Sequence, residues 1–232
     1  RRVEAKIAPP GGAAAMYYTR PSEDLTRPGR TWYPTNGRTV FPRWREPTTA
    51  YHEGVPGHHL QVATATINSE KLSRFQRSTF VSGHGEGWAL YAERLMDEFG
   101  FHANPEYRLG FLYMQALRAA RVVIDIGIHC GFAIPDNWSW HAGEQWTPEL
   151  ALEFLTARSV GDDAFNQSEI NKYLGWPGQA MSYKLGERVW LDLRQAAQKK
   201  HGTKFELSKW HAYALDLGNL GLELLQKELS RF

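Results

Sequence analysis

Three histidines and two glutamates between residues 52 and 86 stand out by their type and spacing. His52 and Glu53 are adjacent, His58 and His59 follow after a Pro-Gly pair, and Glu86 comes at the start of the next helix-like run. Imidazole nitrogens and carboxylate oxygens are the usual protein ligands of a catalytic zinc ion, and a second carboxylate beside the first ligand can act as general base. These residues therefore predict a metal site that activates water.

A proline sets the spacing between the histidine ligands. In sites of the His-Glu-two residues-His type the histidines lie four residues apart on one helix, but the residue four after His52 is Pro56. On a straight helix, His59 would return to nearly the same face as His52. Proline lacks a backbone N–H and glycine weakens a helix, so we expect a bulge at Gly54 to Gly57 instead. If the bulge absorbs two residues, His58 is the second ligand, and His59 is the alternative.

The carboxylates have different predicted roles. Glu53, next to the first ligand, is expected to face the activated water as general base. Glu86 can reach back to the two histidines from a second helix, which gives three protein ligands and leaves a fourth position for water. Glu93 lies two turns further on nearly the same face, so it either competes with Glu86 or acts behind the ligands.

Composition limits the classes of function. The net charge is only +2 and the basic residues are spread over the 232-residue chain, so a nucleic acid is not an expected partner. One cysteine, Cys130, excludes an internal disulfide framework. No run approaches the length of a membrane-spanning segment, and the first residues lack the apolar stretch of a signal peptide. Localisation and oligomeric state are left open.

The pattern of residues predicts a mainly α fold. Residues 1–50 are rich in Pro, Gly and aromatic residues, and the runs 17–19 and 31–33 predict a small β-hairpin or two edge strands. Residues 51–232 have apolar residues at helical spacing. Helices are expected at 106–129 and at 177–201, the latter ending before Gly202. Another is expected to begin after Thr147 as N-cap, with Pro148 in its first turn. One or two more are expected within 207–232.

Three segments resemble one known family. Residues 52–61, 86–91 and 177–186 read HEGVPGHHLQ, EGWALY and PGQAMSYKLG. They are similar to motifs of the bacterial DUF885 proteins, which are usually much longer than this chain. The resemblance implies that residues 1–232 are a single catalytic-type domain from the C-terminal part of such a protein. The motifs are in turn similar to those of helical gluzincin peptidases, which implies a zincin-like helical metallopeptidase domain with Zn²⁺ as cofactor.

The resemblance also points to a tyrosine. The segment around Tyr183 is similar to one in helical carboxypeptidases whose phenol faces the substrate, which implies that Tyr183 stabilises the negative charge of the tetrahedral intermediate. Tyr173 is a weaker candidate for this role, and a packed core tyrosine is the alternative for both.

Further charged residues are candidates for a supporting role. Arg121, Asp125 and His129 lie four residues apart on one helical face, so they either orient His129 toward a substrate or ligand, or form a purely structural network. Arg118 and Lys184 could each receive a peptide carboxylate, and the sequence does not distinguish between them.

The predicted function is that of a zinc-dependent hydrolase that cleaves peptide bonds through a metal-activated water, with a peptide or small amide as substrate. One alternative is a metal-dependent esterase or amidase acting on a non-peptide substrate, since the same water attacks any such carbonyl. The other is a helical binding module without catalytic activity.

Overall fold

The computed structural model describes residues 2–11, 13 and 15–232. Arg1, Gly12 and Ala14, which belong to the segment predicted to be irregular or strand-forming, lie outside the described residues. The chain forms two compact units, one from Arg1–Phe111 and Leu185–Phe232, the other from Leu112–Lys184. It passes from the first unit to the second within one long helix and returns within another.

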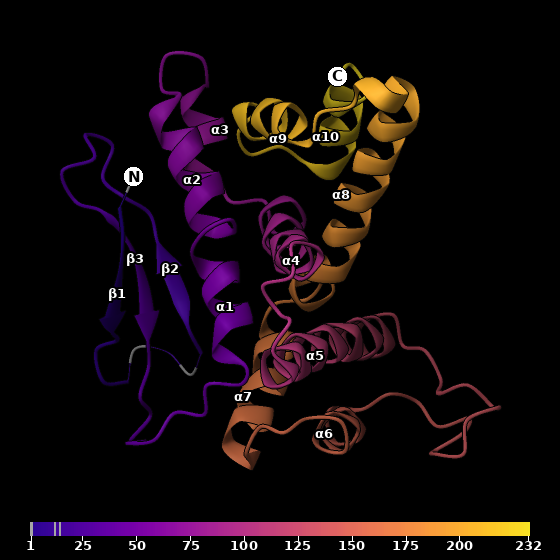
Figure 1. Ribbon diagram of the computed structural model, residues 1–232. Helices are drawn as coiled ribbons and strands as arrows, with labels where there is room; N and C mark the ends of the chain where they lie inside the picture. Colours follow the sequence, from indigo (N-terminus) through magenta and orange to yellow (C-terminus); the bar gives the residue numbers. More distant parts are fainter. Residues whose placement is uncertain (1, 12, 14) are drawn as a thin grey trace. The chain divides into compact units, whose positions relative to one another are not determined.

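The mainly α fold with a small N-terminal sheet is confirmed. In the first unit α4 packs beside α1 and α2 on one side and α8 on the other (Figure 1). Its core gathers large aromatic rings from α4, α8 and α9, including Trp88, Trp190 and Trp210, which are almost fully buried. The helices that contribute to this unit are α1 (Glu46–Glu53), α2 (His58–Ile67), α3 (Arg74–Ser78), α4 (Ser82–Glu98), the start of α5 (Pro105–His129), most of α8 (Gln179–His201), α9 (Leu207–Asp216) and α10 (Leu222–Leu229).

The sheet contains the predicted hairpin and one further strand. β2 (Tyr17–Thr19) pairs antiparallel with β3 (Gly29–Tyr33), as expected. β1 (Val3–Ile7) pairs parallel with β3, which gives the strand order β1-β3-β2. The parallel strand was not predicted, because parallel pairing needs a long connection and leaves no local turn signal. The sheet lies alongside α1 and α2 (Figure 1).

The predicted interruption between the two histidine segments is confirmed. α1 ends at Glu53 and α2 begins at His58. Gly57 approaches the preceding helix so closely that a Cβ atom there would lie 1.9 Å from the carbonyl oxygen of His52. The backbone N–H of His59 donates to the carbonyl of Gly54 at 3.0 Å, so the turn also starts the second helix. A residue with a side chain cannot replace Gly57 without moving one of the helices.

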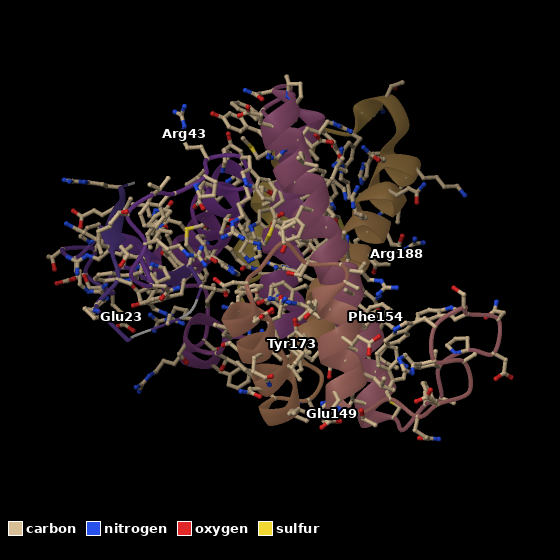
Figure 2. All side chains as sticks on the ribbon, turned by 90° about the horizontal axis from the view of Figure 1, so that it is seen from below. Glu23, Arg43, Glu149, Phe154, Tyr173 and Arg188 are labelled. Atoms are coloured by element: carbon tan, nitrogen blue, oxygen red, sulfur yellow. The ribbon has the colours of Figure 1, made fainter. Side chains whose placement is uncertain are left out.

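The second unit packs helices around an aromatic and aliphatic core. It contains the rest of α5, α6 (Pro148–Thr156), α7 (Asp163–Gly175) and the first residues of α8. Phe154 and Tyr173, labelled in Figure 2, belong to this core. The side chain of Thr147 accepts from the N–H of Leu150, as expected of an N-cap.

Helix positions follow the sequence pattern in most places. The expected helices at 106–129 and 177–201, and the two in the C-terminal tail, are confirmed. α7 was not predicted, because its few apolar residues give little helical periodicity. Its N-cap, Asp162, accepts from the N–H of Phe165 at 2.8 Å and is the local signal that could have located it.

Candidate metal centre

The structure brings together the three residues predicted as ligands. Nε2 of His52 and Nε2 of His58 each lie 3.3 Å from Oε2 of Glu86. The candidate ligand atoms of all three residues lie within 4.8 Å of one another, and all three residues are buried. The imidazole rings meet edge to face, with centroids 4.8 Å apart. Two neutral imidazoles and one carboxylate are a ligand set of catalytic zinc sites.

The contacts within the triad leave the carboxylate of Glu86 unsatisfied. Oε2 of Glu86 is buried and has no hydrogen-bond partner among the described residues, because its 3.3 Å contacts lack hydrogen-bond geometry. An unsatisfied buried acceptor is costly, and more so when it is charged. A cation held between the three side chains would satisfy the carboxylate and both nitrogens at once. The chemistry of the donor set therefore fits a zinc ion.

The charges of the triad depend on one another. Burial acts to lower the pKa of His52, but its contacts with Glu86 and Glu93 outweigh this effect and raise the pKa to about 9. Burial acts to raise the pKa of Glu86, but its contacts with His52 and His58 bring it well below the usual value. Without a metal, a proton on His52 therefore balances the carboxylate, and a metal ion has to displace that proton.

Glu93 supports the first candidate ligand, His52, from the side away from Glu86. Its Oε1 lies 2.7 Å from Nδ1 of His52, and its Oε2 accepts from the hydroxyl of Thr48 at 2.8 Å. Of the two roles open for Glu93, the structure places it behind the candidate ligand His52, where it fixes the ring and directs Nε2 toward Glu86. Thr48 precedes His52 by one helical turn. That spacing is a signal in the sequence that could have located Thr48.

Replacing Glu93 by Gln is expected to weaken zinc binding about 10- to 100-fold, because a neutral amide polarises the His52 ring less than a carboxylate does. Titration with a competing zinc chelator measures the change. The matched control is Glu98→Gln on the same helix, since Glu98 pairs with Arg194 near the surface. Equal zinc affinity in Glu93→Gln and wild type would contradict this role.

His59, the alternative second ligand, is turned toward the sheet. Its Nδ1 lies 2.8 Å from the hydroxyl of Tyr18 on β2, and the rings meet edge to face. Gly29 on β3 packs against this pair so tightly that a Cβ atom there would lie 2.5 Å from Nδ1 of His59. The structure thus places His58 in the triad, whereas His59 links α2 to the sheet through its contact with Tyr18. Tyr18 had no sequence signal, since it comes from a distant strand.

Glu53 ends α1 directly after the first candidate ligand and is buried. Its negative charge contributes to the raised pKa of His52 and, after burial and Glu46, to the raised pKa of Tyr33. The carboxylate therefore lies near the triad. Its predicted role as general base stays a prediction.

The glycines beside Glu86 serve packing. A Cβ atom at Gly87 would lie 2.5 Å from Cα of Gly186, so α4 and α8 touch backbone to backbone. A Cβ atom at Gly85 would lie 2.4 Å from the ring of Phe80, which itself meets His58 edge-on at 5.8 Å. Both glycines therefore leave room for packing, Gly87 for the backbone of α8 and Gly85 for the ring of Phe80.

The remaining predicted site residues belong to the second unit. The hydroxyl of Tyr183 accepts from Nε2 of Gln179 at 3.3 Å. Nε2 of His129 lies 3.0 Å from the carbonyl oxygen of Tyr173 and 3.5 Å from Oδ1 of Asp125. The Asp125–His129 part of the expected ladder is thus present. The catalytic roles of Tyr183 and His129 stay predictions.

Comparisons with known proteins identify a family. The chain matches a family model described as "Bacterial protein of unknown function (DUF885)" over residues 1–229. No curated protein matches it. None of the helices in the described ranges has the length and apolar character needed to cross a membrane.

Two solved structures are similar to the chain. One is described as a candidate lipoprotein from Colwellia psychrerythraea, with 32% identity and a TM-score of 0.86, over 99% of this chain and 38% of that chain. The other is described as a candidate lipoprotein of unknown function from Shewanella oneidensis. It has 21% identity and a TM-score of 0.68, over 85% of this chain and 36% of that chain. At this identity the similarity shows the fold alone. This chain spans just over a third of the length of each.

Proposed function

This chain belongs to the DUF885 family of bacterial proteins of unknown function, and we propose that it is a zinc-dependent hydrolase that cleaves peptide bonds. The observation that supports this most is the buried triad of His52, His58 and Glu86, whose carboxylate oxygen has no hydrogen bond within the described residues. A zinc ion in such a site lowers the pKa of water and polarises a carbonyl group.

In this proposal the residues around the triad move the proton of the attacking water and stabilise the negative charge that develops on the carbonyl oxygen. Glu53 takes the proton from the attacking water and passes it to the leaving amine. Glu93 keeps the ring of His52 oriented through the contact at Nδ1. Tyr183 donates a hydrogen bond to the oxygen that becomes negative, and His129 assists in binding the substrate. The last two roles come from the sequence alone.

The experiment that tests this proposal compares peptides with matched esters and non-peptide amides. Purified protein is expected to cleave peptides, to lose that activity when a chelator removes the metal, and to regain it when zinc is added. The amount of cleaved product, measured by mass spectrometry, gives the rate for each substrate class.

The same panel separates the alternatives. Cleavage of esters or non-peptide amides without cleavage of peptides would replace the proposal by an esterase or amidase that uses the same triad. Stoichiometric zinc without turnover of any class would contradict a hydrolase and favour a binding module.

A further inference from the structure

The second unit buries two arginines on one face of α5. Arg118 and Arg121 are 6% and 5% exposed, and their three-residue spacing puts them on the same side of the helix. Both guanidinium groups lie near the ring of Tyr183, with Cζ 4.7 and 5.2 Å from its centroid. A buried charge is costly unless an opposite charge and hydrogen bonds compensate it, so each arginine needs a partner.

Arg121 has its partners within the unit. It forms an ion pair with Glu169 through Nη2, and its Nε donates to the hydroxyl of Tyr173 at 3.0 Å. That hydroxyl in turn donates to Oε2 of Glu169 at 2.7 Å. Burial acts to raise the pKa of Glu169, but the positive charge of Arg121, with smaller effects from Lys172 and Arg118, keeps that pKa below its usual value. Glu169 therefore forms its ion pair with Arg121 and acts on Arg118 only through its field.

Arg118 has no such partner. Its Nε is buried without a hydrogen bond, and its guanidinium group forms no hydrogen bond or ion pair with any residue in the part of the chain that the structure describes. Asp125, another buried carboxylate of this unit, is already bound to the backbone N–H groups of Gly178 and Met181 at 3.1 and 3.2 Å. The stacking on Tyr183 holds Arg118 in place but supplies no counter-charge.

A second polar group beside Tyr183 is also unsatisfied. Gln179 is 5% exposed and donates from Nε2 to the hydroxyl of Tyr183, while its Oε1 is buried without a hydrogen bond among the described residues. The surroundings of Tyr183 thus offer a guanidinium group that is not bonded to a carboxylate and an amide oxygen without a hydrogen bond among the described residues. Lys184, the other candidate for a carboxylate, already donates to Gln115.

We propose that Arg118, stacked on Tyr183 and assisted by Gln179, binds the carboxylate of a ligand that also carries an amide N–H, such as the C-terminal residue of a peptide. The planar guanidinium group matches a carboxylate through two parallel hydrogen bonds. A single guanidinium group without a bonded counter-ion matches a single negative charge, which favours a carboxylate over a phosphate dianion. This inference goes beyond the proposed function, since binding at Arg118 requires neither zinc nor hydrolysis.

Calorimetric titration with N-benzoylglycine and its neutral carboxamide tests the site. Wild type is expected to bind the acid at least about tenfold more tightly than the amide, because the charge-assisted pair is lost with the amide. The affinity for the acid should be the same in zinc-loaded and chelator-treated protein. Arg118→Gln should lose at least about tenfold in affinity for the acid. The matched control is Arg158→Gln, since Arg158 also stacks on a ring, that of Phe154, but is exposed and already bonded to a carbonyl.

Thermal unfolding separates binding from a structural role. Because Arg118 is not bonded to a carboxylate, Arg118→Gln should unfold no lower than wild type, whereas Arg121→Gln should unfold lower because it breaks the ion pair with Glu169. Arg118→Lys, which keeps the charge, should retain part of the affinity. No measurable binding of the acid, equal binding of acid and amide, tighter binding of inorganic phosphate, loss of binding on chelation or a collapse of the fold in Arg118→Gln would each overturn the proposal.

Discussion

Replacing Glu53 by Gln is expected to leave zinc in place and to lower kcat for peptide hydrolysis by about 10²- to 10⁴-fold, the usual contribution of a general base. The amide keeps the shape of the side chain but cannot take a proton from water. Zinc content is measured by elemental analysis and kcat by peptide cleavage on the same preparation. A lower kcat with unchanged zinc content is the result expected of a general base that is not itself a metal ligand.

The matched control for this variant is Glu46→Gln at the other end of α1. Glu46 is half-buried and, like Glu53, faces Tyr33 closely enough to raise its pKa. The control should hydrolyse peptides like wild type. If Glu53→Gln also retained wild-type kcat, Glu53 would not be the base.

Replacing a single ligand is expected to remove the metal altogether. His52→Ala, His58→Ala and Glu86→Ala each leave only two protein ligands, and we expect each to hold less than about a tenth of the zinc of wild type after dialysis. Elemental analysis gives the zinc content, and circular dichroism shows whether each variant keeps its helices.

The neighbouring histidine supplies the control. His59→Ala removes the hydrogen bond to Tyr18 and should cost about 1 kcal/mol of folding free energy, yet it should keep its zinc. Loss of zinc in His59→Ala together with retention in His58→Ala would mean that the ligand pair is His52 and His59.

The sequence was most informative where chemistry and backbone restrictions coincide. Pro56 and its flanking glycines exclude a straight helix, and the structure shows the break between Glu53 and His58. The break turns two adjacent histidines to different neighbours, the first to Glu86 and the second to Tyr18. Spacing alone left both histidines open, because the size of a bulge depends on packing that no local pattern encodes.

What the sequence could not supply are partners that only tertiary packing brings together. β1 reaches β3 by parallel pairing, and Tyr18 reaches His59 from a strand 41 residues away. The sequence also does not show that Arg118 lacks an ion pair among the described residues, because this depends on Glu169 pairing with Arg121 instead. Helical spacing left two roles for Glu93, either competing with Glu86 or acting behind the candidate ligands. The contact with Nδ1 of His52 favours the second role.

The central claim is that His52, His58 and Glu86 together hold zinc. Anomalous scattering tests it most directly, with data collected on either side of the zinc absorption edge from crystals of the protein grown with one equivalent of zinc. The account predicts a single strong peak between Nε2 of His52, Nε2 of His58 and the carboxylate of Glu86. A peak beside His59 instead, or no peak near these three side chains, would contradict it.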